Sequence, residues 1–150
     1  MLSRASKYAI LSTLYLAEHA SKEKKMSVKS IANSINVPSP FLAKLFQQLV
    51  KCNIISSTKG PNGGFFLTED NEKKTVIDII EEIDGTNKID DCFLGLAKCD
   101  GNNPCPVHFI VEPFKKKIFG KFRDQTIKEF ANEVEAQGSV LFLSGLDKKK

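Results

Sequence analysis

The stretch SVKSIANSINVPSPFLAKLFQQLVK, residues 27–51, decides the fold of this chain. Apolar residues recur in it every three to four positions, in two short runs separated by the turn 36–38. Ser27 can cap the first run as a helix, and Ser39 the second, with Pro40 at the first helical position, where a missing N–H costs little. Two short helices joined by a tight turn predict a helix-turn-helix. The apolar positions are Val28, Ile31, Ala32 and Ile35, then Phe41, Leu42, Leu45, Phe46 and Leu49.

The segments on either side complete a winged form of this motif. Residues 6–20 have helical apolar spacing and predict a preceding amphipathic helix. Residues 54–58 and 65–68 predict two strands, joined by the glycine-rich turn 59–64. A plain surface hairpin is the alternative, but a hairpin directly after two helices of this length favours a wing. The predicted fold class is therefore mainly α with a small β-hairpin wing, a winged helix-turn-helix DNA-binding domain.

The distribution of charge favours a polyanionic partner for the first half. Residues 1–68 hold nine Lys or Arg and two acids, net +7, whereas residues 69–150 hold thirteen and sixteen, net −3. Charge alone would fit a solvated lysine surface equally well, but a helix-turn-helix places its second helix in a major groove. The residues predicted to contact DNA are Arg4, Lys7, Lys29, Ser39, Pro40, Phe41, Lys44, Gln47, Gln48, Lys51, Lys59, Gly60, Pro61, Asn62, Gly63 and Gly64.

The second half of the chain predicts further helices and a dimer. Thr75 begins a Thr-x-x-Asp cap. Apolar residues then continue at helical spacing over nearly thirty residues after position 107, more than a lone helix leaves exposed, so a second subunit is the natural partner. We expect Pro113 to kink this long C-terminal dimerisation helix and Gly120 to weaken it. The predicted regions are 1–70, the winged helix-turn-helix; 71–91, a connecting helix and loop; 92–108, a Cys/His loop; 109–136, the dimerisation helix; and 137–150, a partly disordered tail.

Three cysteines and a histidine crowd into the Cys/His loop. Cys92, Cys99, Cys105 and His108 lie within seventeen residues of a chain with four cysteines and two histidines in all. The intervening glycine, asparagines and prolines cannot extend a helix or a strand, so the segment predicts a metal or cluster site. Four such ligands suit a 2Fe–2S cluster, with a 4Fe–4S cluster as a variant. Zinc and a metal-free thiol switch remain alternatives, although the spacing is atypical of zinc.

Other function classes find little support in the sequence. No motif indicates a nucleophile with its base, or paired carboxylates, so we expect no enzyme. Neither a charged-then-apolar leader nor a run long enough to cross a bilayer is present, which predicts a cytoplasmic protein with no membrane partner. Because the cytoplasm is reducing, we expect the four cysteines to be metal ligands or free thiols rather than disulfides. The remaining Cys52 and His19 are expected to be a buried structural residue and an exposed one.

Four segments resemble the IscR/NsrR group of bacterial winged-helix regulators, also called the Rrf-two family. They are residues 6–9, residues 41–49, the wing residues 59–65 and the cysteine cluster. The resemblance spans roughly residues 1–130 and implies a homodimeric DNA-binding transcription regulator whose long C-terminal helix builds the dimer. It also implies an iron-sulfur cluster held by three cysteines and one histidine, all four of which match here. Two departures are Lys59, where relatives commonly carry Arg, and a first cysteine spacing one residue longer.

Together these features predict a transcription regulator that senses redox state, iron-sulfur status or nitric oxide. The expected partners are a palindromic double-stranded operator, a second copy of the chain and cluster-assembly proteins. A zinc-binding or thiol-switch regulator is the first alternative. A metal-binding adaptor, in which the winged helix contacts proteins, is the second.

Overall fold

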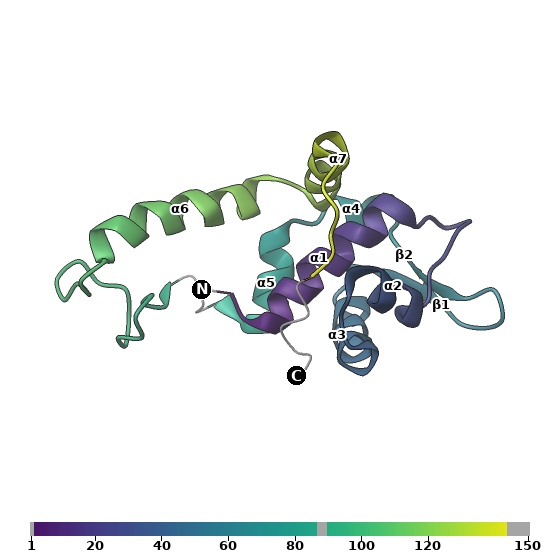
Figure 1. Ribbon diagram of the computed structural model, residues 1–150, viewed down its shortest axis with the longest axis horizontal. Helices are drawn as coiled ribbons and strands as arrows, with labels where there is room; N and C mark the ends of the chain where they lie inside the picture. Colours follow the sequence, from purple (N-terminus) through teal and green to yellow (C-terminus); the bar gives the residue numbers. More distant parts are fainter. Residues whose placement is uncertain (1, 87–89, 144–150) are drawn as a thin grey trace.

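The protein is described here by a computed structural model that places residues 2–86 and 90–143. Several helices pack against the first one, α1 (Arg4–His19), and a two-stranded sheet and the helix α6 (His108–Asp124) project at opposite ends (Figure 1). The elements are α1 (Arg4–His19), α2 (Val28–Ile35), α3 (Ser39–Lys51), β1 (Ser56–Thr58), β2 (Gly64–Phe66), α4 (Glu69–Glu72), α5 (Val76–Asp84), α6 (His108–Asp124) and α7 (Ile127–Gln137). The mainly helical prediction with a small hairpin is confirmed. No helix in the described ranges is long and apolar enough to cross a bilayer.

The helix-turn-helix forms where its apolar spacing predicts it. The Ser27 side chain accepts a hydrogen bond from the Ser30 backbone and caps α2, and Asn36 ends this helix in the left-handed conformation with φ 62°. One prediction is wrong by a residue: Ser39 is the first residue of α3, and Pro38, extended with ψ 124°, is its N-cap without a side-chain hydrogen bond. The shared core contains Ile31, Ile35, Leu42, Phe46 and Leu49, all fully buried.

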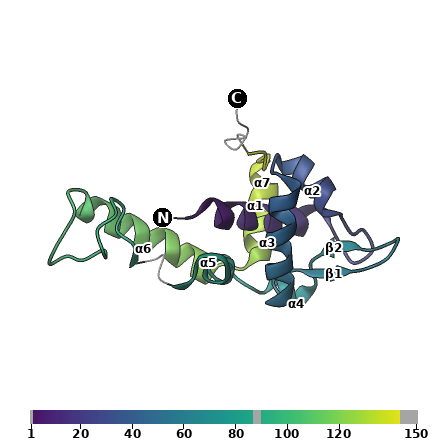
Figure 2. The ribbon, with the colours of Figure 1, turned by 90° about the horizontal axis from the view of Figure 1, so that it is seen from below.

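The wing is shorter than predicted and gains support from a third segment. Ser56 pairs with Phe66 and Thr58 with Gly64 in antiparallel register. Met26, just before α2, exchanges two backbone hydrogen bonds with Phe65, at 3.0 and 2.7 Å. The hairpin projects at the end of the molecule opposite to α6 in both views (Figures 1 and 2). This third segment anchors the wing to the helix-turn-helix.

Substitution by alanine is expected to change the free energy of unfolding in opposite directions at two glycines, Gly63 and Gly120. A Cβ at Gly63 would clash with the carbonyl oxygen of Thr58 and the backbone of Lys59, whereas a Cβ at Gly120, inside α6, meets nothing within 4 Å. Gly63→Ala should therefore lower the free energy of unfolding by about 1–3 kcal/mol, because the wing turn must open. Gly120→Ala should raise it by about 0.5–1 kcal/mol through the lower helix cost of alanine. Chemical denaturation of both variants checks the pair, and changes of the same sign would contradict it.

The predicted long helix 109–136 is in fact two helices. α6 continues through Pro113 and Gly120 without a break and ends at Asp124. Thr126 then starts α7 with a capping box, in which its side chain and that of Glu129 satisfy each other's backbone N–H groups. Apolar spacing continues across this junction, so periodicity alone does not show the break.

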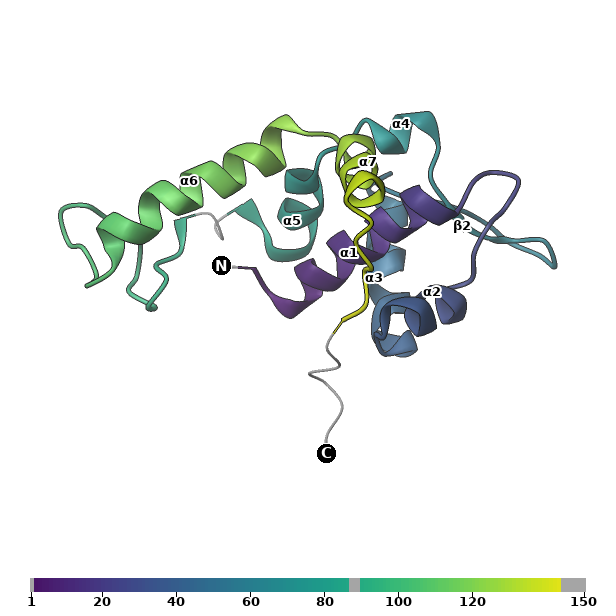
Figure 3. The ribbon, with the colours of Figure 1, turned by 45° about the horizontal axis from the view of Figure 1, so that its top comes forward.

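The second of these helices belongs to the winged body rather than to a partner subunit. Figure 3 shows α7 lying across α1, and Ile127 is fully buried there. The Ile127 backbone N–H also donates to the carbonyl of Lys74 at 2.8 Å. The predicted dimerisation helix is therefore wrong for residues 127–136, whose apolar side chains are used within the subunit.

The chain after α7 returns to the helix-turn-helix. The backbone N–H of Leu143 donates to the carbonyl of Ile35 at 3.0 Å, and the Asn36 side chain donates to the carbonyl of Leu143 at 2.9 Å. Residues 139–143 of the tail predicted to be partly disordered are thus placed in the structure, with Leu143 bound at the end of α2. Residues 144–150 of that predicted tail lie outside the described residues.

Candidate functional site

The cysteine loop lies at the start of α6, far from the wing (Figures 1 and 2). Residues 92–107 form turns and bends, as their composition predicts. Backbone hydrogen bonds join its parts: Cys99 N–H to the Asp90 carbonyl at 2.9 Å, and His108 N–H to the Cys105 carbonyl at 3.0 Å. The loop therefore folds back on itself and ends on the first residue of α6.

His108 is a buried imidazole whose two ring nitrogens face Cys99 and Glu112. Its side chain is 2% exposed, and Nδ1 lies 3.4 Å from the Cys99 sulfur. Nε2 lies 3.0 Å from a Glu112 carboxylate oxygen, one helical turn along α6. A buried imidazole between a thiol and a carboxylate is held in a fixed orientation, and imidazole is a common metal ligand.

Cys92 and Cys105 form a second contact in the loop. Their thiols lie close enough for Cys105 to help lower the pKa of Cys92, and Cys105 is buried. Desolvation raises the pKa of Cys92, but hydrogen bonds from the backbone of Leu96 and Leu94 and from Cys105 outweigh it, so its pKa is lowered overall. A lower pKa favours the thiolate, the form that binds metals.

The four predicted ligands thus fall into two pairs, Cys92 with Cys105 and Cys99 with His108. Within residues 2–86 and 90–143, no three His, Cys, Asp or Glu side chains gather around one point. Cys52, at the end of α3, stands apart from both pairs: burial and the Glu82 charge raise its pKa. It is half-buried, whereas the sequence predicted a buried residue.

The predicted DNA-contacting residues of α3 share its outer face. Lys44, Gln47, Gln48 and Lys51 are exposed, whereas the apolar residues between them are buried. Phe41 is also exposed and makes a T-shaped contact with Tyr8, with ring centroids 5.4 Å apart. The other predicted contacts on helices are Arg4, Lys7, Lys29 and Pro40, which are exposed, and Ser39, which is half-buried.

The contact of Tyr8 with Phe41 brings the start of α1 beside the start of α3. Lys7, on that part of α1, is exposed. In the wing, residues 59–62 are exposed at the turn, and Gly63 and Gly64 are half-buried behind them. The basic residues of α1, α3 and the wing all remain accessible to a partner.

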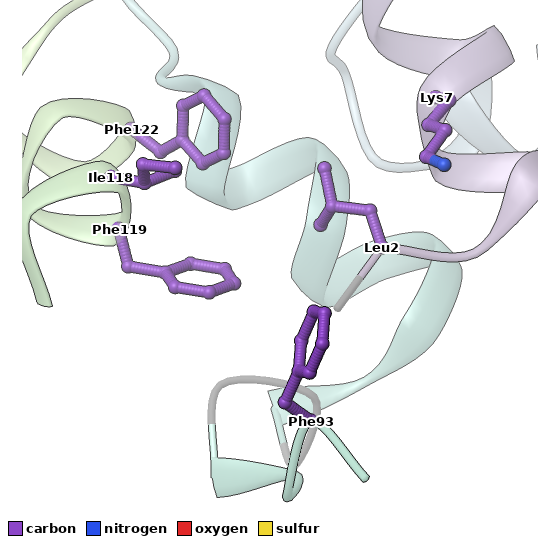
Figure 4. A pocket seen from close by; sticks show the side chains of 6 residues that line it. All are labelled: Leu2, Lys7, Phe93, Ile118, Phe119 and Phe122. Carbon is purple, nitrogen blue, oxygen red and sulfur yellow. The ribbon is translucent and has the colours of Figure 1, made fainter. Parts of the chain in front are cut away.

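Sequence reasoning missed a cavity between the cysteine loop and the winged body. It has a volume of about 340 Å³ and is open on one side. Figure 4 shows Phe93 reaching toward Leu2 from below, with the aromatic rings of α6 facing them. The residues that line it are Leu2, Lys7, Phe93, Ile118, Phe119 and Phe122. These come from three distant segments, so no local sequence signal could have found the cavity.

The sequence profile of the Rrf2 family, described as iron-dependent transcriptional regulators, matches residues 2–133. This chain belongs to the Rrf2 family. A protein of Aquifex aeolicus (strain VF5), named as an HTH-type transcriptional regulator, is 37% identical to the Rrf2 chain over 134 residues, covering 88% of it and 92% of the relative. The HTH-type transcriptional regulator IscR of Photorhabdus laumondii is 27% identical over 134 residues, covering 89% and 80%.

Solved structures agree with this assignment. T. potens IscR matches the Rrf2 chain with a TM-score of 0.63 and 25% identity, covering 91% of this chain and 90% of that one. CymR, the global cysteine regulator of B. subtilis, matches with a TM-score of 0.68, covering 89% and 97%; at 20% identity this likeness shows the fold alone. The Rrf2 chain is therefore a winged-helix, DNA-binding transcription regulator. Its relatives are transcription regulators, and nothing in the comparisons points to catalytic activity.

Proposed function

We propose that this Rrf2 regulator binds DNA as a homodimer and senses iron-sulfur status, redox state or nitric oxide through a 2Fe–2S cluster. Cys92, Cys99, Cys105 and His108 would hold the cluster. The observation that carries the proposal is the buried His108, whose Nδ1 lies 3.4 Å from the Cys99 sulfur at the end of the loop that holds the three cysteines. The family's description as iron-dependent regulators supports it.

The pairing of the donors fits this cluster better than it fits zinc. A 2Fe–2S core takes two protein ligands on each of its two irons, and the chain offers two pairs of donors. A structural zinc ion needs four donors around one centre, yet among the described residues no group of three His, Cys, Asp or Glu side chains is arranged to hold a metal ion. When bound, the cluster would supply the sensing chemistry: it would change charge with the redox state, or be lost when iron-sulfur status or nitric oxide changes. A 4Fe–4S cluster and zinc are the alternatives.

The residues next to the ligands offer a route from the loop to the DNA-binding half. Phe93 follows Cys92 directly and lines the cavity with Leu2 and the aromatic residues of α6. A change in the setting of Cys92 would move Phe93 against Leu2, two residues before α1. Because α1 packs on α3, this movement would shift the balance between two settings of the recognition helices.

The DNA contacts follow from the exposed face of α3 and from the wing. Gln47, Gln48 and Lys44 would reach base edges in the major groove, while Lys59 to Gly64 would approach the backbone or minor groove. Arg4, Lys7 and Lys29 would contact phosphates and fix the register. Two-fold symmetry of the dimer predicts a palindromic operator with half-sites about one helical turn, or a multiple, apart. Cluster-assembly proteins would load the loop.

Anaerobic purification tests the cluster directly. We expect visible absorption together with about two iron and two sulfide ions per protomer. About one zinc ion per protomer without sulfide would favour the zinc site over the cluster. Neither metal in protein expressed with sufficient iron would contradict both.

Lys44 provides a test of sequence reading by α3. Lys44→Ala should weaken binding to an operator selected from a random duplex library by about tenfold or more, and weaken binding to random DNA less. Lys128→Ala, an exposed lysine of α7, is the matched control and should leave the operator affinity unchanged. Competitive gel shifts at one fixed salt concentration measure both. Equal losses on operator and random DNA would reduce Lys44 to a phosphate contact.

The contact between Cys92 and Cys105 favours one second candidate, a thiol switch in the cluster-free protein. Hydrogen peroxide would take two electrons and two protons from the two thiols, giving a disulfide and two waters. Mass spectrometry of peroxide-treated apo-protein would detect the Cys92–Cys105 disulfide. The thiol switch would be favoured over the cluster if the protein never holds iron and its operator affinity differs between the reduced form and the Cys92–Cys105 disulfide form.

A further inference from the structure

Lys115 is a buried lysine on α6, seven residues beyond His108. Its side chain is 5% exposed, although lysine is among the residues least often buried. The Nζ ammonium donates a hydrogen bond of 2.7 Å to the backbone carbonyl of Asp91. Asp91 directly precedes Cys92, so this bond joins α6 to the beginning of the cysteine loop.

The neighbouring carbonyls of the loop are held as well. The Asp90 carbonyl accepts from the Cys99 N–H at 2.9 Å, and the Cys92 carbonyl accepts from the Gly95 N–H at 3.1 Å. Those two bonds lie within the loop, whereas the bond from Lys115 links it to a rigid helix. A charged donor makes a stronger hydrogen bond than a neutral one.

His108 and Lys115 lie two helical turns apart on one face of α6. Lys115 also lines a small cleft, of about 150 Å³, together with Cys99 and Glu112. The lysine is therefore bonded to the residue before Cys92 and shares a cleft with Cys99. Its stem fills space at the helix surface while its ammonium fixes the backbone.

We propose that Lys115 is a positioning residue for the cysteine loop. Its ammonium holds Asp91, and with it Cys92, against the helix that carries His108, so that both donor pairs are pre-organised before a cluster arrives. The role in cluster binding rests on the proposed function, but the anchoring of the loop does not. The two parts are therefore tested separately.

Amide hydrogen exchange in the cluster-free protein tests the anchoring. Lys115→Met keeps the length of the stem and removes the ammonium, and Lys117→Met changes an exposed lysine of the same helix. We expect the Gly95 and Cys99 amides to exchange about tenfold faster in Lys115→Met than in Lys117→Met, because a hydrogen bond to a charged group is lost. Unchanged exchange of both amides in a folded Lys115→Met protein would overturn the proposal. Lys115→Gln replaces this variant if it does not fold.

The rate of iron loss to a chelator tests the role in cluster binding. We expect iron absorbance to decay about tenfold faster in Lys115→Met than in Lys117→Met, with thermal unfolding of the apo-proteins unchanged, since support for ligands commonly matters on this scale. Equal decay rates would overturn this role. Wild-type protein that never holds iron would instead refute the proposed function, while faster exchange in Lys115→Met would still establish the anchoring.

Discussion

Cys92→Ala is expected to abolish the visible absorption and to lower iron and sulfide to background after anaerobic purification. The substitution removes one of two paired thiols and also the contact that holds Cys105. Loss of a direct ligand should weaken cluster binding more than about hundredfold, because changes in supporting residues alone cost tenfold to hundredfold. Iron and sulfide assays beside the absorption spectrum measure the effect.

Cys52→Ala is the matched control for this variant. Cys52 lies at the end of α3, away from both donor pairs, and its sulfur contacts the carbonyl of Leu49 at 3.5 Å. We expect its iron and sulfide content to equal that of the wild type. A Cys92→Ala protein that keeps a full cluster would remove Cys92 from the ligand set.

Placing a charge on the outer face of α6 is expected to separate the dimer. Phe109, Ile110 and Phe114 are 70%, 76% and 54% exposed, an apolar group at the start of a helix that projects from the body (Figure 1). Monomers rarely leave such a patch uncovered, so we expect the partner's helix to cover it. Ile110→Glu should give a monomer by sedimentation and lower operator affinity by about hundredfold or more, since the two half-sites are no longer held together.

Val140→Glu supplies the control for the dimer prediction. Val140 is 84% exposed and follows α7, so the same change of charge falls outside the proposed interface. This variant should sediment as a dimer and bind the operator like the wild type. An Ile110→Glu protein that remains dimeric would place the interface elsewhere.

The helix-turn-helix could be predicted from the sequence because its signals are local. Ile31 and Ile35 lie on one face of α2 and are fully buried, and Ser27 caps the helix as its residue type indicates. The break between α6 and α7 also has a local signal, the Thr126 and Glu129 capping box. It was missed because the apolar spacing runs across it, and periodicity does not show which partner an apolar face packs against.

The remaining features depend on contacts between distant parts of the chain. The bond between Leu143 and Ile35 and that between Lys115 and Asp91 join segments whose sequences give no sign of each other. The composition of residues 92–107 predicted a segment without helix or strand, which the structure has, but not that its Cys and His side chains lie in two pairs. Pairing is set by the folding of the loop against α6, which the spacing of the residues does not specify.

The central claim is that the state of the Cys92 to His108 loop controls DNA binding, and one comparison tests it most directly. The operator affinity of anaerobically purified, cluster-loaded protein is measured beside that of the same protein after chelation of its iron, at one salt concentration. We predict affinities that differ by about tenfold or more, with Cys92→Ala matching the chelated protein. Equal affinities for all three would contradict the account.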